Sequence, residues 1–190
     1  MLSLVSGTLS IGRILFAVVF FLCLQADLFC RPIQEGDLAP DFKLQSMSGD
    51  SFSLSQFRGS LVLLNFWATW CPPCVEEIPS MEQLNRRLKA RAFNVLAVSV
   101  DRNWSEIESF FKDFSGKATY LVLLDSRRKI ATDLYGVEKF PESFLIDQNG
   151  VVRKKIIGAI DWMNPKLGRE LEEILNSNAP KNQAKPIKTK

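Results

Sequence analysis

Histidine is absent from the 190-residue chain. A Ser-His-Asp triad or a Cys-His nucleophile needs an imidazole as its base, so both kinds of active site are excluded. A histidine metal site and covalent haem attachment at a CxxCH motif are excluded for the same reason. The four cysteines are therefore the obvious reactive groups.

The chain also has almost no excess charge outside its C-terminal end. The formal net charge is +3, but Lys181, Lys185, Lys188 and Lys190 lie within the last ten residues, which contain no acid. Without these four residues, 20 basic side chains stand against 21 acidic ones. A nucleic-acid groove needs clustered basic side chains on the folded surface, so we predict no nucleic-acid partner. Residues 179–190 are predicted to be a disordered, lysine-rich tail.

No apolar run is long enough to match an ordinary membrane-spanning helix, which needs about 20 residues. The longest run, Ile14–Leu24, has eleven residues and follows Arg13. That length suits the apolar region of a signal peptide, about 7–15 residues. Three interpretations of residues 1–30 stay open: a cleaved signal peptide, a short uncleaved membrane anchor, or lipid attachment at Cys23 or Cys30. All three place the remaining chain outside the cytoplasm, whereas a buried core helix is disfavoured by the terminal position.

Between residues 34 and 178 the apolar patterns of strands and helices alternate, which predicts one α/β domain with a mixed central sheet flanked by helices. Turn residues indicate two hairpins, one at each end of this domain. The predicted strands cover 42–44, 52–54, 61–67, 95–100, 120–124, 143–146 and 151–157, and the predicted helices cover 74–88, 104–114, 129–135 and 165–175. Pro79 is expected to kink the first long helix without ending it. Trp104 and Trp162 are expected in the core or at its edge.

A Cys-Pro-Pro-Cys motif, Cys71 to Cys74, stands where the strand 61–67 gives way to a helix. Residues three apart on a helix are neighbours, so the two sulfurs can close a disulfide. The helix N-terminus favours the thiolate of Cys71, and Cys74 is expected to be less exposed and to act as the resolving thiol. A purely structural disulfide would stabilise little, on the order of 2 kcal/mol for so short a loop. A zinc site is disfavoured because no second cysteine pair lies in the domain.

The segment Asn65–Cys74 (NFWATWCPPC) resembles the active-site segment of the thioredoxin superfamily. The resemblance is closer to its extracytoplasmic TlpA/ResA-like branch, which includes thiol–disulfide oxidoreductases of cytochrome c maturation. Residues 36–42 (GDLAPDF) resemble the start of that domain, and residues 137–147 (VEKFPESFLID) resemble its cis-proline segment. Residues 101–125 fall where the branch carries an extra helix and strand. The resemblance covers about residues 36–176 and implies a thioredoxin-like sandwich with an N-terminal hairpin.

The resemblance also implies a client-binding surface around Cys71. It implies that Pro141 is cis and packs beside Cys71, and that the Phe140 peptide group offers its backbone to an extended client segment. Trp70 is expected to pack around the same site. The resemblance implies no metal and no cofactor.

Two interpretations of the role of Glu77 stay open. It follows Cys74 by three residues on the same helical face, where it could exchange a proton with that thiol or tune its pKa. Alternatively it is a solvated glutamate near the helix N-terminus, as Glu76 is expected to be. Asn65 stands where thioredoxin has a buried aspartate, and an amide cannot move a proton at neutral pH.

The predicted function is an extracytoplasmic thiol–disulfide oxidoreductase, in the periplasm or cell envelope, that acts on client proteins with cysteine pairs. Pro72 and Pro73 remove backbone donors that could stabilise the thiolate, so we predict a comparatively reducing pair. Such a pair needs a membrane-embedded electron donor and suits a client such as apocytochrome c. Two alternatives are a peroxiredoxin-like thiol peroxidase and a binding module that holds clients without turnover.

Overall fold

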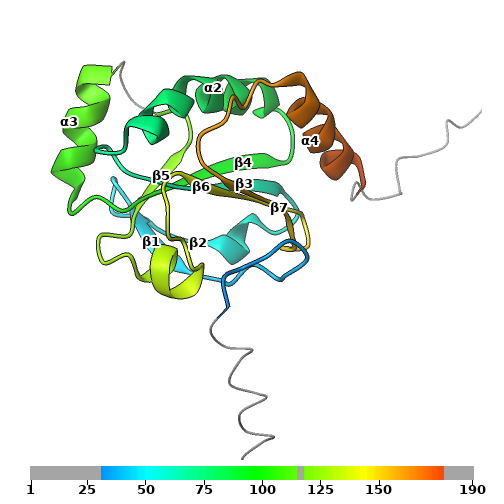
Figure 1. Ribbon diagram of the computed structural model, residues 1–190, viewed down its shortest axis with the longest axis horizontal. Coiled ribbons are helices and arrows are strands. Elements are labelled where there is room, and N and C mark those ends of the chain that lie inside the picture. The colour runs from blue at the N-terminus through cyan, green and yellow to red at the C-terminus, as the bar shows by residue number, and fades with distance from the viewer. Residues whose placement is uncertain (1–30, 115–117, 178–190) are drawn as a thin grey trace, which may run out of the picture. The chain divides into compact units, whose positions relative to one another are not determined.

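The computed structural model describes residues 31–114 and 118–177, so the expectations for residues 1–30 and 179–190 lie outside the described ranges. A seven-stranded sheet with the order β2-β1-β5-β4-β3-β6-β7 forms the centre (Figure 1). The strands are β1 (Lys43–Ser46), β2 (Ser51–Ser53), β3 (Leu61–Trp67), β4 (Phe93–Ser99), β5 (Leu121–Leu124), β6 (Glu142–Ile146) and β7 (Val152–Ile157). The helices are η1 (Leu54–Phe57), α2 (Pro72–Leu88), α3 (Trp104–Phe114), η2 (Lys129–Leu134) and α4 (Pro165–Ser177).

The sheet is mixed, as predicted. Strands β3, β4 and β5 run parallel to one another, whereas β1, β6 and β7 pair antiparallel with their neighbours. All seven residues of β3 are buried, because this strand lies inside the sheet and is covered on both faces. That explains its nearly continuous apolar sequence, which differs from the alternation of a half-exposed strand.

Helices α2, α3 and α4 cover one face of the sheet, and η1 and η2 cover the other (Figure 1). Right-handed crossovers from β3 to β4 and from β4 to β5 place α2 and α3 on the same face. Alternate residues of β3 therefore meet different layers. Trp67 packs against Phe110 and Phe111 of α3, and Phe66 packs on the other side against Tyr135, just after η2.

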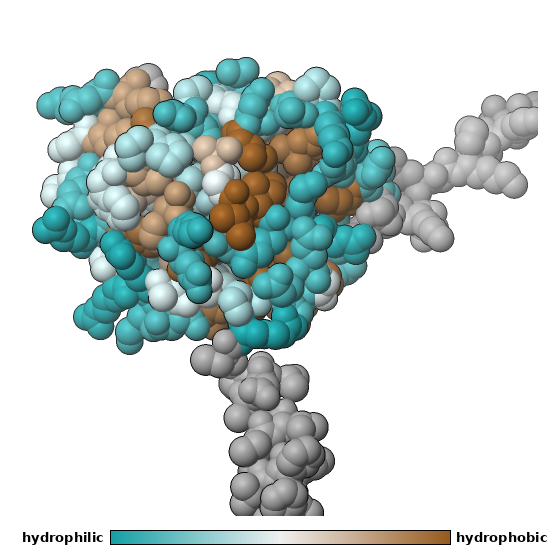
Figure 2. Space-filling model, in the orientation of Figure 1, coloured by the Kyte–Doolittle hydropathy of each residue, from teal (hydrophilic) through white to brown (hydrophobic). Residues whose placement is uncertain are grey.

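The predicted hairpins and long helices are present with shifts of only a few residues, and α2 continues through Pro79 to Leu88. The short helix predicted at 129–135 is a π-helical turn, in which the Tyr135 N–H donates to the Ile130 carbonyl five residues back. Apolar side chains gather near the centre of the face seen in Figure 2, with hydrophilic residues around them. Within residues 31–114 and 118–177, no helix has the length and apolar character needed to cross a membrane.

Candidate active site at the carboxyl edge of the sheet

One edge of the sheet collects the loops that carry the predicted site. The carboxyl ends of the parallel strands β3, β4 and β5 meet at this edge, and the antiparallel strand β6 begins there. The loop after β3 carries the Cys-Pro-Pro-Cys motif, and the segment before β6 carries Pro141. The topology thus joins segments about 70 residues apart in the sequence, as the resemblance implied.

Cys71 and Cys74 form a disulfide, with Cα atoms 5.3 Å apart. Cys71 is the N-cap residue of α2, and the helix starts at Pro72. Proline is tolerated there because the first N–H groups of a helix have no intrahelical acceptor. Cys71 is 6% exposed and Cys74 is 0% exposed. Of the two cysteines, Cys71 is therefore the more accessible. No cluster of three or more metal-ligating side chains occurs in the described residues.

A buried carboxylate fixes the loop before the motif. Asp101, which follows β4, is fully buried and accepts hydrogen bonds from the Thr69 N–H (3.1 Å), the Thr69 hydroxyl (2.8 Å) and the Ser99 hydroxyl (2.6 Å). Sequence reasoning missed this role of Asp101. Because the Thr69 hydroxyl donates to Asp101, it is already engaged and offers no free donor for a peroxide.

The Phe140–Pro141 peptide bond is cis, as the resemblance implied. Pro141 is buried, whereas Trp70, next to Cys71, is 54% exposed. The rings of Trp70 and Phe140 meet edge to face with their centroids 6.1 Å apart. The cis-proline segment and the motif are therefore in contact through these two rings, while the packing of Pro141 on Cys71 itself stays a prediction.

Glu77 is buried, with 3% of its surface exposed, so the interpretation as a solvated helix glutamate is wrong. Its Oε1 accepts a hydrogen bond from Asn65 Nδ2 at 2.8 Å. Its Oε2 accepts from the Trp162 indole Nε1 at 3.2 Å and from the Ile160 N–H at 3.4 Å. Glu76, in contrast, is exposed as predicted.

Burial raises the pKa of Glu77 from 4.5 to about 7, because it penalises the charged carboxylate, although the hydrogen bonds from Asn65, Ile160 and Trp162 act in the opposite direction. A group with this pKa carries either proton state at neutral pH, which is what a general acid or base needs. Glu77 lies one helical turn from Cys74, on the same face. The arrangement can therefore take a proton from Cys74 or return one.

Two residues of this network were missed in the sequence. Trp162 was expected only as a core or edge residue, yet its indole reaches Glu77 across 85 positions of sequence. The Ser143 hydroxyl accepts the other hydrogen bond that Asn65 Nδ2 donates, at 2.9 Å. The available signal was general, since a buried tryptophan usually finds a partner for its N–H. The backbone of Trp162 is also held, because its N–H donates to the Ser80 hydroxyl at 3.1 Å.

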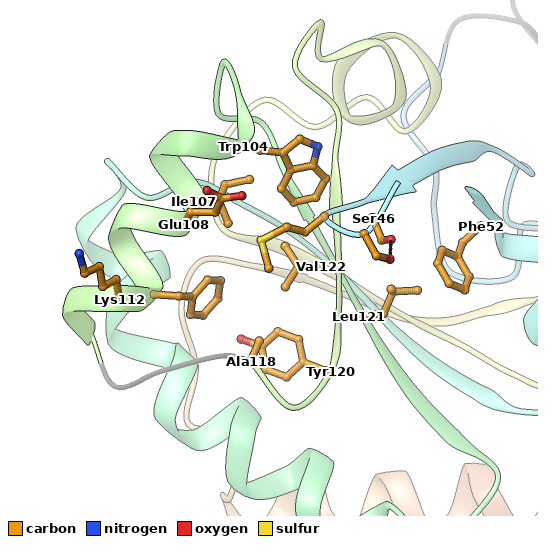
Figure 3. Close-up of a pocket in the computed structure, with 13 residues that line it drawn as sticks. Ser46, Phe52, Trp104, Ile107, Glu108, Lys112, Ala118, Tyr120, Leu121 and Val122 are labelled. Atoms are coloured by element: carbon orange, nitrogen blue, oxygen red, sulfur yellow. Dashed lines mark hydrogen bonds between the residues drawn. The ribbon is translucent and has the colours of Figure 1, made fainter. Parts of the chain in front are cut away.

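A concave region of the surface lies apart from this site. It is an apolar groove of about 790 Å³ between α3, β5 and the β1–β2 turn (Figure 3). Its lining includes Trp104, Ile107 and Phe111 from α3. On the opposite side it includes Leu121 and Val122 of β5 and Tyr120, which precedes that strand. None of its lining residues belongs to the motif or to the cis-proline segment. The groove is therefore separate from the candidate active site.

Known proteins with similar sequences carry related descriptions. The chain matches the AhpC/TSA family over residues 36–155. It is 37% identical to the thioredoxin-like protein YneN of Bacillus subtilis over 131 residues, 67% of this chain and 74% of YneN. It is 38% identical to the thiol-disulfide oxidoreductase ResA of Geobacillus thermodenitrificans over 125 residues, 66% of this chain and 70% of that protein.

Solved structures agree with the sequence matches. A structure from Chlorobium tepidum, described as a thiol:disulfide interchange protein DsbE, is 35% identical with a TM-score of 0.68, covering 75% of this chain and 99% of the other. StoA from Bacillus subtilis is 26% identical with a TM-score of 0.57, covering 73% of this chain and 97% of the other. The chain therefore belongs to the AhpC/TSA family, and its Cys71–Cys74 pair is that of a thioredoxin-like thiol–disulfide oxidoreductase.

Proposed function

We propose that this oxidoreductase reduces disulfides of client proteins outside the cytoplasm, with Cys71 as the attacking thiol. The observation that carries the proposal is the unequal placement of the two sulfurs. Cys71 lies at the helix N-terminus beside the exposed Trp70, whereas Cys74 is enclosed. A client disulfide can therefore approach only one of them.

The exchange runs in two steps. The reduced Cys71 thiolate attacks one client sulfur, which forms a mixed disulfide and releases the other client sulfur as a thiolate. Cys74 then attacks the Cys71 sulfur, which frees the second client thiolate and closes the Cys71–Cys74 disulfide. Two electrons pass from the pair to the client. Glu77 takes the proton that Cys74 loses as it attacks, because it is the buried carboxylate one turn away.

The direction of electron flow follows from the residues between the cysteines. A dithiol becomes a strong oxidant when its reduced form is specially stabilised, and Pro72 and Pro73 offer no backbone N–H for that purpose. The pair is therefore reducing, and a reductant in an oxidising compartment needs a membrane-embedded donor of electrons. A fitting client is apocytochrome c, whose haem-attachment cysteines must be free thiols.

The placement outside the cytoplasm rests on the sequence of residues 1–30. The eleven-residue apolar run after Arg13 suits a signal peptide or a short anchor. A reporter enzyme that is active only after export, fused after Lys190, is expected to be active. A silent fusion that is stably produced would refute the placement.

A trapping experiment tests the function itself. Cys74→Ser removes the resolving thiol, so Cys71 should stay covalently bound to the client it attacks, and mass spectrometry then identifies that client. The Cys71→Ser, Cys74→Ser double variant is the control and should trap nothing. Equilibration of the wild type with glutathione buffers should give a midpoint toward about −270 mV, whereas a value near about −120 mV would make the protein an oxidase.

A further inference from the structure

A short basic segment, Arg127–Lys129, lies at the same edge of the sheet as Cys71, in the loop that follows β5. Arg128 has φ = 56° and is the only residue other than glycine with a positive φ in the described ranges. An L-residue rarely adopts this conformation unless its surroundings impose it, and such residues cluster at functional sites. The backbone of this loop therefore adopts a specific conformation that the sequence alone does not reveal.

Asp125 imposes this geometry from inside the protein. Its carboxylate is 4% exposed and accepts hydrogen bonds from the backbone N–H groups of Ile130 (2.9 Å) and Ala131 (2.8 Å). The Arg128 N–H donates to the Asp125 carbonyl at 2.9 Å. The backbone of Arg128 is thus held in place before any client binds, while its side chain lies outside.

The side chain of Arg128 joins the client-facing surface. Its guanidinium carbon lies 5.6 Å from the centroid of the Trp70 ring, which is the range of a cation–π contact. Trp70 in turn meets Phe140, the residue before the cis-proline. Arg128, Trp70 and Phe140 therefore form one continuous surface beside Cys71, with a positive charge at its border.

The cations of this segment form no ion pair with the residues that the structure describes. Arg127, Arg128 and Lys129 are exposed, and no carboxylate in residues 31–114 or 118–177 forms an ion pair with them. Some cations elsewhere in the described ranges do form ion pairs, as Arg91 does with Glu172 at 2.7 Å. The exposed carboxylates that follow the segment in sequence are Asp133 on η2 and Glu138, and Glu138 is balanced by its neighbour Lys139. On α2 the exposed Glu76 carries a negative charge two residues after Cys74.

We propose that the basic segment Arg127–Lys129 selects clients whose disulfide is flanked by acidic residues. The inference rests on the proposed function, because it names the kind of client that the same site accepts. A carboxylate on the client can hydrogen-bond in bidentate fashion to the Arg128 guanidinium while the client cysteine faces Cys71. The neighbouring charges of Arg127 and Lys129 attract the same segment over a longer range and raise the association rate.

Three disulfide-bonded peptides test the proposal. They share one cysteine pair, and its flanking residues are glutamate, glutamine or lysine. The second-order rate of reduction by the reduced full chain is measured for each. We expect the glutamate peptide to react at least about tenfold faster than the lysine peptide at low salt, and this ratio to approach one in 1 M salt, where charges are screened beyond about 3 Å.

Charge-reversal variants locate the source of the selectivity. Arg128→Glu should lower the glutamate-to-lysine ratio at least about fivefold. The matched control is Arg87→Glu, which makes the same change on the exposed surface of the last turn of α2, about 24 Å along the helix axis from Cys71. It should leave the ratio unchanged. Lys129→Glu should also lower the ratio, and because it leaves the Arg128–Trp70 contact unchanged, it controls for a folding defect in the Arg128 variant.

The outcomes separate this inference from the proposed function. Equal rates for the three peptides would overturn the selectivity and leave the oxidoreductase activity standing, because the glutamine peptide is still reduced. A ratio that both reversal variants leave intact would show that another part of the chain is responsible and would also overturn the proposal. Reduction of none of the peptides would overturn both the selectivity and the proposed function.

Discussion

Cys71 and Cys74 are three residues apart, yet they border two different environments. On the Cys71 side lie Trp70, 54% exposed, and the exposed cation Arg128, which contacts the Trp70 ring. On the Cys74 side lies Glu77, 3% exposed, in a network of hydrogen bonds from buried groups. The difference separates two tasks. Client recognition needs an accessible, solvated surface, whereas a carboxylate with a raised pKa needs an enclosed one.

Replacing each cysteine in turn gives the largest effect and tests whether the two sides differ. Cys71→Ser should abolish disulfide reduction, by at least about 10³-fold, because the attacking thiol of the pair is lost. Cys74→Ser should lose turnover to a similar extent and yet form a mixed disulfide with a client peptide. Mass spectrometry of the protein after reaction measures this. A mixed disulfide on Cys74 in the Cys71→Ser variant would contradict the division into two sides.

The stability of the oxidised protein against pH tests the enclosed side alone. Folding raises the pKa of Glu77 from 4.5 to about 7, so the folded state binds the proton more tightly than the unfolded state. The resulting stabilisation is fully present below about pH 4.5 and is lost as the pH rises through 7. The loss amounts to about 3 kcal/mol, at 1.36 kcal/mol per pKa unit.

Denaturant unfolding of the wild type and of Glu77→Gln measures this contribution. The variant should not show the decline between about pH 4.5 and pH 7, because its amide does not titrate. Since the Asn65 amide can turn to accept from the new amide, the variant is expected to fold. Glu142 and Asp125, whose pKa values burial also raises, contribute equally to both proteins and cancel in the comparison. Identical pH dependence of the two proteins would show that Glu77 does not titrate in this range.

The proton transfer to Glu77 should have a kinetic consequence. Glu77→Gln should slow the attack of Cys74 on a preformed mixed disulfide by about 10²-fold at pH 8, the lower end of what a positioned base contributes. The wild-type rate should rise through an inflection near pH 7, which the variant should lack. Glu76→Gln is the matched control because Glu76 is exposed on the same helix. Small, equal effects of both changes would remove Glu77 from the mechanism.

The fold was largely predictable because its signals are local. The apolar run at residues 61–67 matches β3 residue for residue, and Asn149-Gly150 marks the hairpin between β6 and β7. The cysteine pair and the cis-proline were also found, through motifs that are contiguous in sequence. The strand and the hairpin are determined by neighbouring residues, whereas the cis-proline was predicted only through the family resemblance.

The rest of the site depends on contacts that no local pattern encodes. Helical periodicity placed Glu77 on one face of α2, but its burial depends on the distant residues Trp162 and Ile160. In the sequence the basic residues 127–129 are typical of a solvated loop, and only the folded structure places Arg128 over Trp70. The role of Asp101 likewise needs the neighbouring strands β3 and β4 to end at the same edge.

Chemical labelling of the reduced protein compares the two thiols directly. Cys71 should be alkylated at least about tenfold faster than Cys74 at pH 7, because it is more exposed and lies at the helix N-terminus, where the thiolate is favoured. Brief treatment with iodoacetamide followed by peptide mass spectrometry measures the ratio. Faster labelling of Cys74 would reverse the assignment of attacking and resolving thiols.

The smallest expected effect concerns Trp162, a positioning residue that acts through Glu77. Trp162→Phe keeps an aromatic ring in the core but removes the N–H that donates to Glu77 at 3.2 Å. A carboxylate that loses a hydrogen-bond donor is less stable in its charged form, so the pKa of Glu77 should rise by about half to one unit. The inflection in the rate of Cys74 attack should move to higher pH by the same amount. Trp104→Phe is the control, because Trp104 begins α3 and lines the apolar groove, and it should leave the inflection in place. A packing defect alone would lower stability without moving the inflection. An unshifted profile would therefore show that Trp162 acts only as a core residue. A shifted profile would show that its indole N–H helps to set the pKa of Glu77.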